Sequence, residues 1–258
     1  MDLNLTGCRV IVTAGAAGIG LEVARAFAEE GARVWTCDVN ADAVAALAKS
    51  DPAIKVAVCD VTDRDAVRAF FERATGDMGG LDCLVNNAGI AGATARIEDT
   101  APEDWDRCLE VCLTGQYNFA HLAVPLLRQS ENGSMVNFSS AAGKHGFALR
   151  SAYSAAKWGV IGLTKSLAIE LGEDGVRVNA ILPGIVAGDR QRRVLEAKAQ
   201  RLGKTYSEIE AAAFSYTSVR EYVTARQLAD QILFLASPRG RTISGQAIAI
   251  DGDTKMLA

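Results

Sequence analysis

The chain has 258 residues, 49% of them hydrophobic, which is enough to bury a large core in one α/β domain or in two small domains. Its net charge of −4 comes from acidic and basic residues scattered along the sequence, which argues against a nucleic-acid-binding surface and against a polybasic membrane patch. We therefore expect its partners to be small molecules or further copies of the same chain.

Short β-branched runs alternate along the chain with amphipathic stretches of helical periodicity. Strands are predicted over residues 9–13, 33–38, 55–61, 83–86, 135–139, 176–182 and 246–250. Helices are predicted from residue 18, from residue 41, over 65–75, over 102–127, through 151–159 to residue 171, and over 225–235. This alternation predicts an α/β fold, a doubly wound parallel sheet with helices on both faces, in a single domain over residues 1–258.

Residues 185–223 break this alternation. They form a charged segment, predicted to be irregular, that is longer than a plain connection between a strand and a helix. Because long excursions after a strand are typical of lids, we expect this segment to cover a substrate site.

The N-terminus, MDLNLTGCRVIVT, lacks the features of a secretory signal, and no apolar run approaches the length of a membrane span. The six cysteines have neither the CxxC spacing of a zinc site nor the density of a disulfide scaffold, which favours thiols in a reducing compartment. His121 and His145 belong to no ligand cluster, so no metal is expected. These features predict a cytoplasmic protein without a membrane partner.

The first predicted strand runs into a loop of small residues and then into a helix, which is the context of a dinucleotide-binding loop, with an ordinary tight turn as the alternative. The second strand ends at Asp38, whose carboxylate would accept hydrogen bonds from both ribose hydroxyls and repel a 2′-phosphate. This favours NAD over NADP, since the nearest arginine, Arg33, opens the strand; Asp38 as a plain turn or cap residue is the alternative. The third and fourth strands end near Asp60-Val61 and Asn87-Ala88-Gly89, at the sheet edge where ligands bind.

The stretch SAYSAAKWG places Tyr153 four residues before Lys157 on a predicted helix. Residues at this spacing are neighbours on one helix face, and a cation there favours the tyrosinate form. Tyr153 is therefore a candidate general acid/base, although a surface helix with one tyrosine and one lysine is the alternative.

Together these motifs resemble the short-chain dehydrogenase/reductase family of single-domain Rossmann enzymes, over essentially the whole chain. The loop TAGAAGIG resembles the family's glycine-rich cofactor loop, and Tyr153 and Lys157 match its YxxxK motif. The resemblance extends to the adenine-contacting pair Asp60-Val61, the motif Asn87-Ala88-Gly89, the serine Ser140 thirteen residues before Tyr153, and the segment Asn179-Ala180-Ile181-Leu182-Pro183-Gly184 beside the nicotinamide.

The resemblance implies roles for these residues. Tyr153 would exchange a proton with the substrate oxygen, Lys157 would promote that exchange and bind the nicotinamide ribose, and Ser140 would orient the same oxygen. It further implies that NAD is held by Gly15, Gly18, Ile19, Gly20, Asp38, Asp60, Val61, Asn87, Ala88, Gly89, Tyr153, Lys157, Pro183, Gly184 and Val186.

The chain departs from the family pattern at three positions. Ala14 replaces the first glycine of the cofactor loop, and Gly15 follows it. Cys112 stands where the family carries an asparagine whose backbone carbonyl holds a proton relay; we hypothesise that Cys112 keeps that geometry, with a reactive thiol as the alternative. The usual threonine after Pro183-Gly184 is absent, so Val186 offers only its backbone.

The lid region carries a cluster of charges: Asp189, Arg190, Arg192 and Arg193. An arginine that faces the cleft would suit a carboxylate or phosphate on the substrate, whereas the alternative is a solvated helix face paired with Glu196. The family commonly forms dimers or tetramers through two helices that correspond to residues 102–127 and 154–171 here, so a homo-oligomer is expected.

The leading functional hypothesis is an NAD-dependent dehydrogenase that interconverts a secondary alcohol and its ketone, with a hydroxy acid or a polyol as the substrate. A rival in the same class is an NADPH-dependent carbonyl reductase of the 3-oxoacyl type. A rival of another class is an NAD-binding sensor without turnover.

Overall fold

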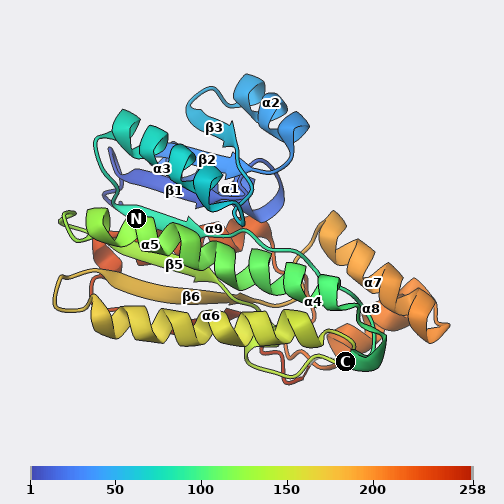
Figure 1. The fold of residues 1–258 in the computed structure, drawn as a ribbon. Coiled ribbons are helices and arrows are strands. Elements are labelled where there is room, and N and C mark those ends of the chain that lie inside the picture. Colours follow the sequence, from blue (N-terminus) through green and yellow to red (C-terminus); the bar gives the residue numbers. More distant parts are fainter. Residues whose placement is uncertain (1, 257–258) are drawn as a thin grey trace.

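Parallel strands form a single sheet in the computed structural model, which describes residues 2–256 apart from the side chain of Arg190 (Figure 1). The strands are β1 (Arg9–Thr13), β2 (Arg33–Asp38), β3 (Ile54–Val58), β4 (Cys83–Asn86), β5 (Ser134–Phe138), β6 (Arg177–Pro183) and β7 (Ala247–Ile250). Their order is β3-β2-β1-β4-β5-β6-β7, so the direction of winding reverses between β1 and β4. A doubly wound sheet binds its ligands outside the carboxyl ends of the strands at such a reversal.

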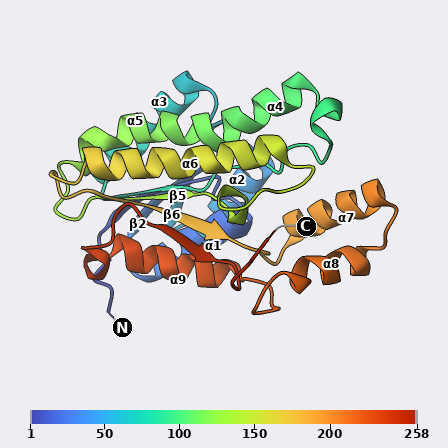
Figure 2. The same cartoon turned by 90° about the horizontal axis from the view of Figure 1, so that it is seen from below.

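Helices cover both faces of this sheet. They are α1 (Gly18–Glu29), α2 (Ala41–Ser50), α3 (Arg64–Met78), α4 (Pro102–Leu109), α5 (Gly115–Leu127), α6 (Ser151–Glu170), α7 (Asp189–Leu202), α8 (Tyr206–Ser215) and α9 (Ala225–Ala236). Figure 2 shows α3, α4, α5 and α6 on one side of the sheet and α1 and α9 on the other. The doubly wound α/β fold predicted from the sequence is confirmed.

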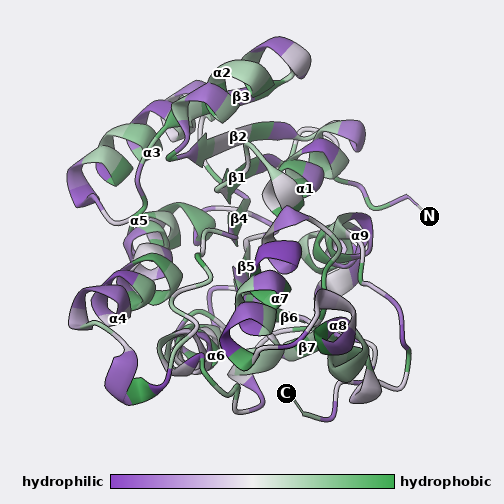
Figure 3. Cartoon of the chain, turned by 90° about the vertical axis from the view of Figure 1, so that its right-hand side faces the viewer, coloured by the Kyte–Doolittle hydropathy of each residue, from purple (hydrophilic) through white to green (hydrophobic). Residues whose placement is uncertain are grey.

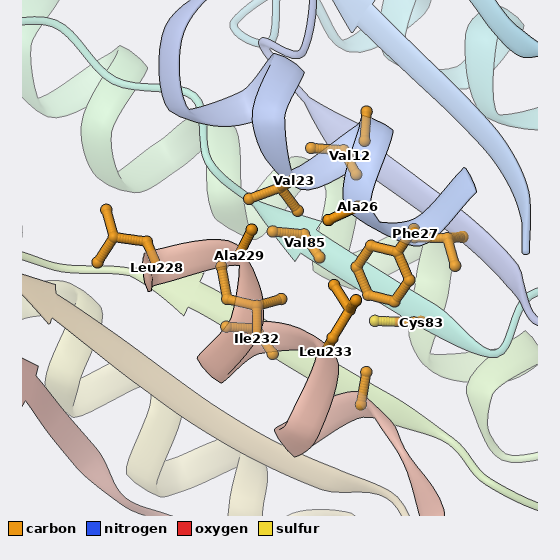
Figure 4. Close-up of a cluster of buried hydrophobic side chains, with 14 of the residues drawn as sticks. Val12, Val23, Ala26, Phe27, Cys83, Val85, Leu228, Ala229, Ile232 and Leu233 are labelled. Atoms are coloured by element: carbon orange, nitrogen blue, oxygen red, sulfur yellow. The ribbon is translucent and has the colours of Figure 1, made fainter. Parts of the chain in front are cut away.

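The core has two layers because the strands bury both of their faces. In β1, Val10 and Val12 join the core beneath α1 and α9, whereas Ile11 points to the core beneath α3 and α5. This alternation follows from the two-residue repeat of a strand. Figure 4 shows the first of these cores, where Phe27 of α1 lies near Leu233 of α9.

The long helix predicted over residues 102–127 has the correct ends, but it is wrong in its middle, where the chain is not α-helical. A π-helical turn, Glu110–Thr114, separates α4 from α5. A π turn inserts one extra residue into a helix without changing the apolar pattern on either side, so periodicity does not reveal it. Such turns occur frequently at functional sites, and this one contains Cys112.

The irregular structure predicted for residues 185–223 is also wrong, because most of this segment is helical. Helix α7 ends at Gly203 in a left-handed conformation, and α8 begins with a capping box between Thr205 and Glu208. Leu195 and Ile209 pack together in a small core of their own. Charged residues occur on both the solvent side and the cavity side of α7, as with Arg192 and Lys198, and they masked the helical periodicity.

Smaller differences affect element ends. Strand β3 ends at Val58 rather than at residue 61, so Asp60 and Val61 lie in the loop that follows it. Within residues 2–256, no helix combines the length and the apolar character that crossing a bilayer requires.

Candidate active site

A cavity of about 680 Å³ lies at the carboxyl ends of the strands. It extends from the loop after β1, past the ends of β5 and β6, to α7 and α8. Figure 3 looks onto this end of the molecule, with α7 and α8 in front of the strands. The cavity therefore lies at the edge where the sequence placed the cofactor and substrate.

The loop after β1 depends on glycine at three positions. A Cβ atom on Gly15 would lie 2.0 Å from Oγ1 of the buried Thr36, and Gly18 has a φ of +56°. A Cβ atom on Gly20 would lie 2.3 Å from the carbonyl oxygen of Ala14. Ala14 itself adopts a φ of +53°, so an alanine occupies the left-handed position. Gly15, Gly18 and Gly20 form the backbone of this loop, as the sequence predicted.

Asn87 holds this loop against the end of β4. Its side-chain amide donates to the carbonyls of Thr13 (2.9 Å) and Ala14 (3.0 Å). The backbone N–H groups of Asn87 and Ala88 both donate to Oγ1 of Thr13. Ala88 is buried in the core, whereas Gly89 and Ile19 line the cavity. Asn87 thus positions the loop and also lines the cavity, whereas Ala88 contributes only to the positioning.

Asp38 lies at the end of β2, half-buried beside the glycine loop. One carboxylate oxygen accepts a hydrogen bond from the backbone N–H of Ala16 (3.3 Å), and the other accepts one from Asn40 (3.1 Å). Arg33 lies at the opposite end of the strand, where its guanidinium donates to the carbonyls of Met78 and Asp77.

Asp60 lies in the loop after β3 and is held by its neighbours. One oxygen accepts hydrogen bonds from the backbone and hydroxyl of Thr62, and the other pairs with Arg107 at 3.0 Å. Burial alone would raise the pKa of the Asp60 carboxyl, but these hydrogen bonds outweigh it and hold the pKa below its usual value. Val61 packs closely against Gly115, whose missing side chain leaves room for it. Among the described residues, those that line the cavity do not include Asp38, Asp60 or Val61.

Ser140, Tyr153 and Lys157 all line the cavity. Lys157 is 2% exposed, its ammonium donates to the carbonyl of Phe138 (2.7 Å), and it lies 5.7 Å from the centre of the Tyr153 ring. Ser140 begins a short 3-10 turn, Ala141–Gly143, and its hydroxyl accepts the N–H of Ala142 at 3.2 Å. The structure therefore brings these three predicted residues to the wall of one cavity.

Sequence reasoning missed the part played by Gln116, a buried residue of α5. Its side-chain amide donates to the carbonyl of Cys112 (3.2 Å) and to that of Phe138 (3.0 Å), which also accepts the Lys157 ammonium. The carbonyl of Cys112, which lies in the π turn, thus accepts a hydrogen bond from a side chain of α5. The thiol of Cys112 is buried and exchanges hydrogen bonds with the backbone of Ile90. The sequence shows only a glutamine four residues after Cys112, and its burial becomes evident only in the structure.

The end of β6 and the start of the 185–223 segment form the side of the cavity opposite the glycine loop. Pro183, Gly184 and Val186 line it, and a Cβ atom on Gly184 would lie 2.6 Å from Cα of Asp251. Val186 forms a parallel bridge with Val223, which fixes the start and end of the 185–223 segment side by side.

The charges of α7 divide between cavity and solvent. Arg193 and Asp189 line the cavity, whereas Arg192 is exposed and lies 3.8 Å from Glu196. Arg193 is thus placed where it could face a ligand, Arg192 lies on a solvated face beside Glu196, and the side chain of Arg190 lies outside the described part of the chain. Two further cations in the cavity wall, Arg150 and Lys198, were not predicted.

The chain matches, over residues 14–253, a family model described as enoyl-(acyl carrier protein) reductase. It is 35% identical over 254 residues to the 3-oxoacyl-[acyl-carrier-protein] reductase FabG of Thermotoga maritima, covering 97% of this chain and 98% of the relative. The protein belongs to the short-chain dehydrogenase/reductase family. It is also 34% identical over 253 residues to the D-beta-hydroxybutyrate dehydrogenase of Cupriavidus necator, covering 96% of this chain and 98% of the relative.

Solved structures of this family agree with the fold. The chain superposes on an NAD+-bound xylitol dehydrogenase with a TM-score of 0.91, at 27% identity, over 96% of this chain and 99% of the other. It superposes on a variant of actinorhodin polyketide ketoreductase with NADPH with a TM-score of 0.89, at 29% identity, over 94% and 95% of the two chains. The family resemblance drawn from the motifs is therefore confirmed, while relatives of this fold hold either dinucleotide.

Among residues 2–256, no group of three or more His, Cys, Asp or Glu side chains gathers in a way that could hold a metal ion.

Proposed function

We propose that this oxidoreductase transfers a hydride between NAD and a secondary alcohol or the corresponding ketone. The observation that carries the proposal is the meeting of Ser140, Tyr153 and Lys157 on the wall of a cavity whose other end is the glycine loop after β1. Acid/base chemistry needs a proton donor beside the substrate oxygen, and hydride transfer needs a dinucleotide beside the carbon that bears this oxygen.

The residues of the loop fit a dinucleotide. Gly15 and Gly20 stand where a Cβ atom would strike Thr36 or Ala14, so the backbone turns tightly and leaves room for a pyrophosphate at the start of α1. The bound nicotinamide would accept or supply the hydride.

Side chains of the protein transfer the proton. Tyr153 gives its proton to the ketone oxygen in reduction and takes it back in oxidation. Lys157, held by the Phe138 carbonyl, places its ammonium 5.7 Å from the centre of the Tyr153 ring, beside the group that exchanges the proton. Ser140 donates to the substrate oxygen and stabilises the negative charge that develops there.

Asp38 supports NAD as the preferred dinucleotide. Its half-buried carboxylate lies beside the loop, and Arg33 is engaged at the other end of β2. A 2′-phosphate near Asp38 would meet a like charge. The rival is an NADPH-dependent reductase of the 3-oxoacyl type, the reaction named for the Thermotoga maritima relative.

The assembly and the lid are part of the same proposal. We expect a cytoplasmic homo-oligomer, a dimer or a tetramer, because apolar side chains of α5 and α6 face solvent, among them Trp158 (54% exposed) and Ile169 (83% exposed). Residues 185–223 act as a substrate lid, with α7 and α8 over the cavity.

The experiment follows nicotinamide absorbance while secondary alcohols, polyols and hydroxy acids are oxidised with NAD or with NADP. The proposal predicts turnover with a higher kcat/KM for NAD than for NADP. A preference for NADP would favour the reductase rival. Tight NAD binding without turnover of any substrate would favour a non-catalytic sensor.

A further inference from the structure

A buried arginine stands directly beside the proposed proton donor. Arg150, at the start of α6, is 4% exposed and lines the cavity. Its guanidinium carbon lies 4.9 Å from the centre of the Tyr153 ring and 5.3 Å from that of Phe147, and it donates to the carbonyl of Ala91. Two rings and a carbonyl therefore hold the guanidinium in one orientation, which lowers the entropy cost of binding a ligand.

A second cation reaches the same place from the lid. Lys198 of α7 lines the cavity, and its ammonium lies 5.5 Å from the centre of the Phe147 ring. No carboxylate among the described residues forms an ion pair with Lys198. Burial, followed by the charge of Arg150, lowers the pKa of Lys198, which indicates that the two cations act on each other.

Positive charges outnumber negative ones in the cavity wall. The carboxylates that line the cavity belong to Glu22 of α1 and to Asp189 at the start of α7, and Arg193 adds a further positive charge. Apolar side chains such as Leu195 and Ile209 fill the wall between α7 and α8. An anion in this part of the cavity would gain charge-assisted hydrogen bonds in partly dehydrated surroundings.

We propose that the substrate is a short hydroxy acid or its keto acid, whose carboxylate is bound between Arg150 and Lys198. The planar guanidinium fork suits the two oxygens of a carboxylate. Since Arg150 lies against the ring of Tyr153, a carboxylate there is separated by only a short carbon chain from an oxygen that meets the Tyr153 hydroxyl. This inference rests on the proposed dehydrogenase function and narrows its substrate class.

The test compares each acid with its own uncharged ester. The probes are 3-hydroxybutanoate and 4-hydroxypentanoate with their methyl esters, oxidised with NAD by the wild type and by Arg150→Gln, Arg150→Lys and Lys198→Gln. Arg192→Gln is the control, because Arg192 lies on the same helix as Lys198 but faces solvent beside Glu196. Circular dichroism checks that each variant folds. If Arg150→Gln does not fold, Lys198→Gln still decides the test.

We expect the wild type to prefer one of the acids over its ester in kcat/KM by about 10- to 100-fold. Arg150→Gln and Lys198→Gln should each lower the acid-to-ester ratio of kcat/KM most of the way to one, Arg150→Lys should retain part of the preference, and Arg192→Gln should leave the ratio unchanged. The inference would be overturned if the wild type oxidised the esters with the same kcat/KM as the acids, or if the preference for the acid survived both glutamine substitutions. Either result would leave the dehydrogenase function standing.

The proposed function fails separately, if no alcohol of any charge is oxidised. In that case calorimetric titration of 3-hydroxybutanoate into the NAD-loaded protein decides the inference. Binding that weakens in Lys198→Gln but not in Arg192→Gln supports the carboxylate site, and the absence of binding overturns it.

Discussion

Replacing Ala14 with glycine is expected to stabilise the protein. Ala14 has a φ of +53°, in the left-handed region, where contact of Cβ with the backbone costs an L-residue about 1–2 kcal/mol. Glycine relieves that strain but loses about 0.5–1 kcal/mol through the greater freedom of the unfolded chain, which leaves a net gain between about 0 and 1.5 kcal/mol, with a midpoint of about 0.75 kcal/mol. Unfolding entropy of about 2 cal/mol/K per residue makes about 0.5 kcal/mol/K for a chain of this length, so Tm should rise by about 1–2 °C.

Differential scanning calorimetry of the variant and a matched control measures this effect. The control is Ala16→Gly in the same loop, since Ala16 is buried and lies outside the left-handed region. Glycine there removes a buried methyl group and adds chain entropy, so its Tm should fall by about 2–4 °C. If Ala14→Gly lowers Tm as Ala16→Gly does, the backbone at Ala14 is not strained.

Asp38→Ser should reduce the NAD-over-NADP preference in kcat/KM by at least about tenfold, because a hydrogen bond to a charged group contributes about 1.5–3 kcal/mol; an unchanged ratio would show that Asp38 does not contact the ribose. The hydrogen bond from Arg25 lowers the pKa of Asp51 to about 2, and hydrogen bonds from Arg9 outweigh burial and lower the pKa of Asp82. The two ionised carboxylates should stabilise the fold fully above about pH 4, and this stabilisation should be lost as pH falls toward about 2. The midpoint of urea unfolding should therefore fall with pH, and it should fall less steeply in Asp51→Asn than in the wild type. Equal dependence of the midpoint on pH in the two proteins would contradict this. Cys112→Asn should change turnover by less than about tenfold, and a rise by orders of magnitude would show a defective natural relay.

The sheet and one half of the site could be predicted from the sequence because local chemistry determines them. Each strand is a short apolar run followed by small or polar residues, which places Asp38 and Asn87 at the carboxyl edge. Tyr153 and Lys157 needed only the helical repeat to be placed together.

The rest depends on contacts that no local pattern encodes. The π turn that contains Cys112 leaves the apolar periodicity intact, and Gln116 acquires its role only when the Phe138 carbonyl comes within reach. Arg150 and Lys198 lie far apart in the sequence, and they meet at the Phe147 ring only after α7 folds over the cavity.

Turnover by Tyr153→Phe shows whether the Tyr153 hydroxyl carries the proton. Phenylalanine keeps the ring beside Arg150 and removes only the hydroxyl that exchanges the proton. With NAD affinity measured separately by calorimetry, the account predicts a loss of kcat of at least about 100-fold while NAD still binds. Turnover close to that of the wild type would contradict the account, because the proton would then pass through another group.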